Sequence, residues 1–375
     1  KLQSYIVFAS DYTTAKFILY TMFILINLFI KFIILNYILG FYGMRHTIRS
    51  AYFKAKIRQY CSTNPNNNQP LLHPLWITGF TDGEGSFGVK IYKDKGYTLG
   101  WRIQPFFQIK LNARDLDILS RIKGFFGGAG TITFEKDSAK LVITKLSHIV
   151  DKVIPHLEAY PLLAKKYADF ELFRQIILIL KQKSRLSEQG FIKILNLRYN
   201  LNNGISEELK ELYPNLLPVL RPKVPEGVIH PEWLVGFVDG EGSFNVITVE
   251  KISNAASSYK VWLYFQITQH NRDTLLMERL VTYWGCGDVR KRNTAAVDFK
   301  LNKFELMSKI IIPFFHKYPL QSAKYLDFQS FIEAASIIKS KPSRQWSTEQ
   351  FNKIKNIQSN MNKYTKENLV ETEGR

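Results

Sequence analysis

HPLWITGFTDGEGSF, at residues 73–87, recurs as HPEWLVGFVDGEGSF at residues 230–244. Eleven of the fifteen positions are identical at an offset of 157 residues, and weaker identities continue beyond the motif at an offset of 158. They include FQI at 107–109 and 265–267, and YPL at 160–162 and 318–320. The spacing is too long for a solenoid repeat, so it indicates two related modules in one chain.

Each copy predicts the same α+β order of elements. A helix that begins with a proline in its first turn, Pro74 or Pro231, ends at the glycines of DGEG. The α-β-β-α-β-β-α order that follows predicts one antiparallel sheet per module. The expected strands are 86–93, 101–111, 131–135 and 140–144 in the first copy and 243–250, 259–269, 289–292 and 297–301 in the second. In the first copy, helices are expected at 114–125, 145–157, 167–181 and 189–200.

The composition describes a basic globular protein. With 375 residues, 46% of them hydrophobic, the chain is long enough for two or three domains. Its formal net charge of +19 predicts a polyanionic partner. Two distant cysteines, Cys61 and Cys286, exclude a cysteine zinc site and a disulfide framework, and no histidines occur at metal-ligand spacing. Any metal should therefore be a hard ion bound by oxygen.

The first seventy residues differ from the rest of the chain. Residues 17–42 are apolar over about the ~20 residues that span a bilayer, although Asn27, Lys31 and Asn36 interrupt them. Basic residues follow without acids, as in a membrane flank or an import segment. Because the chain opens at Lys1, an exon-derived segment continuous with an upstream reading frame is a third interpretation. We therefore expect a hydrophobic and basic extension at 1–70, a first module at 71–202, a proline-rich linker at 203–228 and a second module at 229–375.

Glycines four residues apart in the two duplicated helices predict a close helix pair. They leave smooth faces on which two backbones can approach about a pseudo-twofold axis, and they are Gly79, Gly83, Gly236 and Gly240. Glu84 and Glu241 would then end the two helices side by side. Adjacent carboxylates repel unless a divalent cation lies between them, and Mg²⁺ suits carboxylate, water and phosphate oxygens. A metal pair on the axis suits the cutting of two antiparallel strands. For Asp82 and Asp239 we expect structural hydrogen bonds instead.

WITGFTDGEGSF and WLVGFVDGEGSF resemble the two LAGLIDADG helices of a single-chain homing endonuclease, of the kind encoded in fungal mitochondrial introns. The resemblance covers roughly residues 71–365 and includes SEELKELYPNLLPVLRP, FQITQHNRD and the GCG turn. It implies a monomer that acts in a mitochondrion, with its two modules forming a saddle of antiparallel sheets. The implied activity is Mg²⁺-dependent hydrolysis of both strands of a long, specific double-stranded DNA site.

The family pattern also implies the roles of five residues. Glu84 and Glu241 would ligate the metal ions, and Lys166 and Lys324 would be the catalytic basic residues. Gln269 would position the water network. Leu111 occupies the position equivalent to Gln269, so the first module lacks that polar group.

Strand alternation predicts a DNA-binding face on each sheet. In the first module the face carries Lys90, Tyr92, Arg102, Gln104, Gln108 and Lys110, and in the second Lys260, Gln266, Thr268, Arg290, Arg292 and Lys300. A curved sheet fits the major groove, where arginine can bind guanine and glutamine adenine while lysines bind phosphates. The aromatic residues Phe106, Trp262 and Tyr264 share this face and favour a partner over solvent.

Two other functions fit the same residues. The first is an RNA maturase, because this fold also assists splicing and the same basic sheets could bind the host group I intron. The second is a membrane protein followed by a decayed intron reading frame. The intact duplicated motif argues against decay.

Overall fold

The computed structural model describes residues 71–182, 186–252, 257–341 and 345–361. Its contacts divide the chain into Lys1–Pro70 and Leu71–Arg375, and the second unit contains all of the described residues. The apolar stretch at 17–42 and the basic residues after it therefore lie outside the described residues. Within the described ranges, no helix has both the length and the apolar character needed to cross a membrane.

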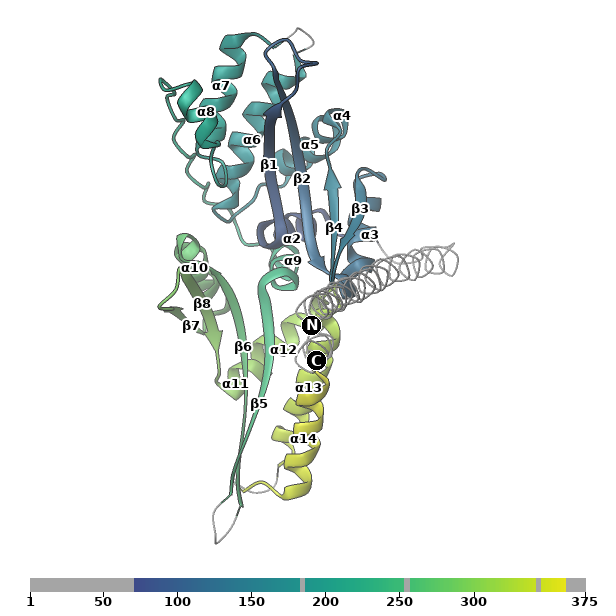
Figure 1. Ribbon diagram of the computed structural model, residues 1–375. Helices are drawn as coiled ribbons and strands as arrows, with labels where there is room; N and C mark the ends of the chain where they lie inside the picture. Colours follow the sequence, from purple (N-terminus) through teal and green to yellow (C-terminus); the bar gives the residue numbers. More distant parts are fainter. Residues whose placement is uncertain (1–70, 183–185, 253–256, 342–344, 362–375) are drawn as a thin grey trace, which may run out of the picture. The chain divides into compact units, whose positions relative to one another are not determined.

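The first module has the predicted order of elements (Figure 1). Its helices and strands are α2 (Pro74–Glu84), β1 (Gly85–Lys93), β2 (Trp101–Asn112), α3 (Leu116–Phe125), β3 (Thr131–Glu135), β4 (Ser138–Ile143), α4 (Leu146–His148), α5 (Ile154–Ala159), α6 (Lys166–Lys181) and α7 (Glu188–Tyr199). Helix α8 (Glu207–Leu212) follows in the expected linker.

The second module repeats this order. It consists of α9 (Pro231–Glu241), β5 (Gly242–Ile252), β6 (Ser257–His270), α10 (Thr274–Trp284), β7 (Asp288–Lys291), β8 (Ala296–Leu301), α11 (Phe304–Leu306), α12 (Ile312–Lys317), α13 (Lys324–Lys339) and α14 (Thr348–Asn360). The predicted α+β class with two related modules is confirmed. The strand expected to end at Arg292 is one residue too long, since β7 ends at Lys291.

Each sheet has four antiparallel strands, in the orders β1-β2-β4-β3 and β5-β6-β8-β7. Along β2, buried residues such as Phe107 and Ile109 alternate with more exposed ones, because successive side chains point to opposite faces. Helices α3 and α6 contact the first sheet, and α10, α13 and α14 contact the second. The buried side chains under these helices form one hydrophobic core that includes both modules.

The helix expected at 145–157 is not continuous. It begins as α4, passes through a π-helical turn at Ile149–Val153 and continues as α5, whose first turn contains Pro155. Proline has no N–H to donate to the fourth residue before it, so the regular hydrogen-bond ladder cannot continue through this point. The second module repeats the turn at Met307–Ile311, just before Pro313.

The first part of the expected linker packs onto the first module. Leu209 of α8 and Ile205 lie with Phe191, Leu195 and Trp101 in a small buried cluster. Ser206 caps α8 by accepting a hydrogen bond from the amide of Leu209. The segment that joins the two modules therefore begins with a helix packed on the first module. Only its later part contains no helix or strand.

Helices α2 and α9 pack backbone to backbone, as the glycine spacing predicts. A Cβ atom placed on Gly79 would lie 2.9 Å from the amide nitrogen of Phe237, and one on Gly236 would lie 2.9 Å from that of Phe80. Such distances are shorter than van der Waals contact, so only glycine permits this approach. We call this contact between α2 and α9 the central helix pair.

Two crossed hydrogen bonds fix the central helix pair. The indole of Trp76 donates to Asp239 at 2.8 Å, and the indole of Trp233 donates to Asp82 at 2.9 Å. Asp82 also accepts from the amides of Leu163 and Ala164, just before α6, and Asp239 accepts from the corresponding segment before α13. Both aspartates therefore have the structural role that we expected of them.

Candidate functional site

Glu84 and Glu241 are the last residues of the central helix pair and lie beside each other. A Cβ atom on Gly83 would lie 3.2 Å from the Cγ of Glu241, and one on Gly240 would lie 3.4 Å from the Cγ of Glu84. Each glutamate side chain therefore crosses the glycine of the other helix. The predicted pairing of the two carboxylates is present.

The surroundings of these glutamates oppose their negative charges. Burial raises the pKa of Glu84 above its ordinary value of 4.5. Burial, and then the charge of Glu84, raises the pKa of Glu241 to about 7. Lys166 and Lys324 act in the opposite direction on both groups. Two carboxylates held in this way favour a proton or a cation between them.

The two predicted lysines lie under the ends of the central helix pair. Lys166 begins α6 and donates from Nζ to the carbonyl of Gly83 at 2.6 Å. Lys324 begins α13 and donates to the carbonyls of Gly240 and Val238 at 3.0 and 2.9 Å. Burial lowers the pKa of both ammonium groups, and the nearby aspartate and glutamate charges raise it. Each lysine thus satisfies helix-end carbonyls and places a positive charge beside the carboxylates.

The two halves of the site differ at one position. In the second module, Gln269 donates to Glu241 Oε1 at 3.1 Å, and its own carbonyl accepts from the amide of His270 at 3.0 Å. Glu241 Oε1 is therefore held by an amide of fixed orientation. In the first module the equivalent residue, Leu111, is buried and apolar. This asymmetry is the one expected from the sequence.

A cavity of about 490 Å³ opens beside Glu84 and Lys324. Lys110, Asn112 and Arg114 are among its lining residues. Arg114 is absent from the residues that we predicted. Its duplication as Arg272 was visible in the sequence and is the signal that could have identified it.

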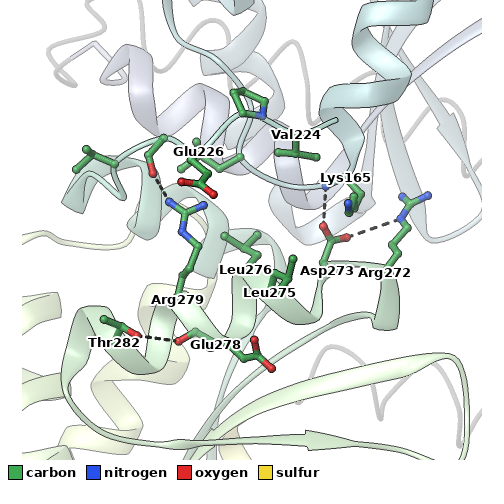
Figure 2. A pocket seen from close by; sticks show the side chains of 14 residues that line it. Lys165, Val224, Glu226, Arg272, Asp273, Leu275, Leu276, Glu278, Arg279 and Thr282 are labelled. Carbon is green, nitrogen blue, oxygen red and sulfur yellow. Dashed lines mark hydrogen bonds and ion pairs between the residues drawn. The ribbon is translucent and has the colours of Figure 1, made fainter. Parts of the chain in front are cut away.

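Residues before the two lysines are held by the opposite module. Asp273 accepts a hydrogen bond from the amide of Lys165 at 2.6 Å, and Asp115 accepts one from the amide of Ala323 at 3.0 Å. Figure 2 shows the first of these bonds at the edge of a second cavity, of about 650 Å³, that is lined by α10 and the end of the linker. In the same view Arg272 Nε faces the carboxylate of Asp273, and 3.7 Å separates Nε from Oδ2.

All twelve residues predicted to bind DNA share the sheet parity that we expected. In the first sheet, Lys90 lies opposite Gln104, and Tyr92 lies opposite Arg102, whose guanidinium is 5.9 Å from the tyrosine ring centre. Gln108 and Lys110 continue the same row toward the site, and Lys140 lies opposite Lys110. Lys140 was missed, although its alternation within its strand placed it on this face.

In the second sheet, the same face carries Lys260, Gln266, Thr268, Arg290 and Lys300. Arg292 follows β7 rather than belonging to it, but its amide still donates to the carbonyl of Ala296 at 3.0 Å. Pairing therefore continues one step beyond the regular strand. Tyr264 packs under Lys300, whose Nζ lies 4.0 Å from the ring centre.

Acidic residues bind part of this basic surface. Glu135 accepts hydrogen bonds from Lys140 at 2.5 Å and from Lys110 at 3.0 Å, and these contacts lower its pKa to about 2. Asp298 binds Arg292 at 2.6 Å. Asp288, opposite Lys300, lies 3.6 Å from Arg290. The two faces are therefore basic surfaces on which acidic residues hold some of the basic side chains.

Comparison with known proteins gives one consistent result. A family model described as LAGLIDADG endonuclease matches residues 77–177 and 234–335. The probable intron-encoded endonucleases 2 and 3 of Neurospora crassa are each 35% identical to the chain, over 72% and 76% of it. The chain spans 61% and 53% of the lengths of these two relatives.

Solved structures also match across the described unit. The homing endonuclease I-SmaMI, bound to an uncleaved DNA target in the presence of calcium ions, has a TM-score of 0.74 and 33% identity, covering 78% of this chain and 99% of its own. I-GzeII in complex with its DNA target has a TM-score of 0.71 and 37% identity, with the same coverage. Each interval of the family match contains most of one central helix and one of the two lysines beneath the helix ends.

Proposed function

Because this chain belongs to the LAGLIDADG endonuclease family, as its duplicated motif predicted, we propose that it is a homing endonuclease that hydrolyses both strands of a long, specific DNA site. The observation that carries this proposal is the pair of half-buried glutamates at the adjoining ends of α2 and α9, each with a lysine beneath it. One carboxylate from each module suits one cut in each strand of an antiparallel duplex.

The residues present fit a hard divalent cation, and we propose Mg²⁺. Glu84 and Glu241 would hold it, since their oxygens are the ligands such ions prefer and their raised pKa values reflect the burial of negative charge that a cation would neutralise. Among the described residues there is no cluster of three or more His, Cys, Asp or Glu side chains suited to a metal. Water and DNA phosphate oxygens would therefore complete the ligand set. Bound Mg²⁺ would supply activation of water and stabilisation of the leaving oxyanion.

The protein's own groups prepare this site. Gln269 binds Glu241 Oε1 and so fixes the orientation of that carboxylate. Lys166 and Lys324 are anchored on helix-end carbonyls, which keeps a positive charge near the position where negative charge develops on the phosphate. The first half of the site, with Leu111, lacks the amide that the second half has. We therefore expect the two strands to be cut at different rates.

The open faces of the two sheets are the proposed DNA-binding surface. Their lysines and arginines would neutralise phosphates, and side chains near the strand centres would contact base edges in the major groove. I-SmaMI and I-GzeII were both solved with DNA targets, which supports this assignment. The DNA-binding set proposed is Lys90, Tyr92, Arg102, Gln104, Gln108, Lys110, Lys260, Gln266, Thr268, Arg290, Arg292 and Lys300.

The relatives support an origin in a fungal mitochondrial intron. We place the action of this protein in the mitochondrion, as a monomer whose two modules replace the two subunits of a dimer. Binding of the host intron RNA as a maturase is the alternative function, and it would use the same basic faces.

The first experiment uses the full chain and a pool of duplexes that includes the intron-free host gene. In Mg²⁺ we expect double-strand breaks at one site, and in Ca²⁺ binding without breaks. Glu84→Gln and Glu241→Gln should each abolish the double-strand break, whereas Glu333→Gln, on the outer part of α13, should not. Tight binding to host intron RNA with no DNA break in Mg²⁺ would favour the maturase instead.

A further inference from the structure

A buried acidic residue, Asp298, lies within the DNA-binding face proposed for the second module, and the role inferred for it rests on that proposed function. Asp298, in the middle of β8, is only 7% exposed and lies opposite Thr268 on β6 and Arg290 on β7. A buried carboxylate on a surface that binds phosphates weakens DNA binding unless a basic or hydrogen-bonding partner offsets its charge. The contacts of Asp298 show which residues do so.

Asp298 organises three of the residues proposed to contact DNA. Its Oδ2 accepts from Arg292 Nε at 2.6 Å, and its Oδ1 accepts from Thr268 Oγ1 at 2.8 Å. Gln266 Nε2 donates to Thr268 Oγ1 at 2.9 Å and lies 3.4 Å from Asp298 Oδ1. Arg292 Nη2 lies 3.3 Å from the same hydroxyl. These four residues form a connected network that we call the Asp298 network.

The network determines which groups are left for DNA. Arg292 uses its Nε and one Nη2 hydrogen toward the protein, so the end of its guanidinium, with one N–H on each Nη, remains available. This paired end matches the O6 and N7 acceptors of guanine. The arginine side chain is 45% exposed, whereas that of Asp298 is 10% exposed. The buried carboxylate therefore holds a guanidinium that is itself accessible to DNA.

The same network fixes the orientation of the Gln266 amide. A carboxylate can only accept hydrogen bonds, so the amide nitrogen of Gln266 must be the group that faces Thr268 and Asp298. Its carbonyl oxygen is left as an acceptor. One N–H of the amide is therefore used within the network, and the second N–H and the carbonyl oxygen remain for a base edge.

The first module reverses this charge pair. Lys140 is the equivalent of Asp298 and lies opposite Lys110 on β2 and Thr133 on β3. Its partner Glu135 has a side chain that is 48% exposed, so here the acid is at the surface and the base lies closer to the sheet. The two half-sites should therefore differ at the base pairs nearest these residues.

We propose that Asp298 is a positioning residue that fixes Arg292 to recognise one guanine in the DNA half-site of the second module. Without Asp298, Arg292 would keep its charge and its attraction to phosphate but lose its fixed orientation. The discrimination between guanine and other bases would then fall, while non-specific affinity would be kept or increased.

The test profiles cleavage by the full chain on duplexes with a randomised window of about two helical turns. The native chain should require guanine at one position within the half-site that the second module contacts. Asp298→Asn should lower the preference for that guanine about 10- to 100-fold, the range that one bidentate contact supplies, and leave unchanged the positions not contacted by Gln266 or Thr268. Arg292→Lys keeps the charge and should lose the same preference. Glu135→Gln is the matched control in the first module and should leave this guanine requirement intact.

The outcomes separate this inference from the proposed function. Unchanged guanine preference in either Asp298→Asn or Arg292→Lys, with cleavage retained, would overturn the inference alone. If Asp298→Asn fails to fold by thermal melting, Asp298→Glu, which keeps the charge but displaces the carboxylate, is profiled in its place. If the native chain cuts no duplex, the selection is repeated for binding in Ca²⁺. Absence of any sequence preference there would reject both, and a guanine preference lost in both the Asp298 variant and Arg292→Lys would retain the inference without cleavage.

Discussion

Glu84 and Glu241 show at the level of single residues how the proposed catalytic arrangement opposes stability. Their carboxylates are half-buried beside each other, and this environment raises both pKa values. The charged form is therefore less favourable in the folded protein than in the unfolded chain. Folding tolerates this cost because Lys166 and Lys324 offset part of the charge.

Replacement of Glu241 by glutamine should stabilise the metal-free protein at alkaline pH. The folded pKa of about 7 exceeds the ordinary 4.5, so the native state is penalised as pH rises from about 4.5 to about 7. Above pH 7, Glu241→Gln should raise the free energy of unfolding by on the order of 2 kcal/mol, and near pH 4.5 the gain should vanish. Urea unfolding in EDTA at pH 5 and pH 8 measures this, with Glu333→Gln as control. An equal change in unfolding free energy at both pH values would contradict the raised pKa of Glu241.

A buried histidine should make the first module sensitive to acid. Burial lowers the pKa of His156 to about 4, and its Nε2 lies 3.3 Å from Thr78 Oγ1. Between about pH 6.5 and pH 4 the unfolded chain gains a proton that the folded protein does not, so stability is lost as pH falls. The double variant Thr78→Val and His156→Phe introduces the residues of the second module, Val235 and Phe314. Its unfolding free energy should decline less over this pH range, and an unchanged decline would exclude His156 as a cause.

At the level of elements, the central helix pair depends on the absence of two side chains. Ala at position 236 would overlap the backbone of α2, so Gly236→Ala should lower the free energy of unfolding by about 3 kcal/mol despite its better helix propensity. Gly124→Ala, in α3 with nothing within 4 Å of the new Cβ, should instead be neutral or stabilise by up to ~1 kcal/mol. Chemical denaturation of both variants checks the contrast. Similar losses in the two would contradict the close approach.

The bounds of most elements could be predicted because their signals are local. Pro74 and Pro231 begin the central helices, glycines end them, and alternation defines the long strands to within one to three residues. The π-helical turns before Pro155 and Pro313 could not be predicted from periodicity. The five residues of each turn have the same hydrophobic pattern as a stretch of α-helix. The contacts of Asp298 in β8 also depend on β6 and on Arg292, which follows β7, so strand parity identified its neighbours but not their hydrogen bonds.

At the scale of the whole molecule, the charge of +19 has a measurable consequence. If six phosphates are neutralised, DNA affinity in Ca²⁺ should fall about 1000-fold between 50 and 200 mM salt. Lys90→Ala should reduce the slope of log affinity against log salt by about 0.9. Lys181→Ala, at the exposed end of α6, should leave it unchanged. Fluorescence anisotropy over a salt series makes the measurement, and a flat salt dependence would exclude phosphate contacts as the source of affinity.

The crossed tryptophan and aspartate bonds of the central helix pair have a consequence for how this protein can be rebuilt. Each of these bonds, Trp76 with Asp239 and Trp233 with Asp82, needs one residue from each module, so neither module forms them alone. None of the four residues lies on the open sheet faces. Halves from different relatives should therefore be interchangeable as cassettes, combining two half-site preferences in one chimera, provided that these four residues and the glycines between them are kept.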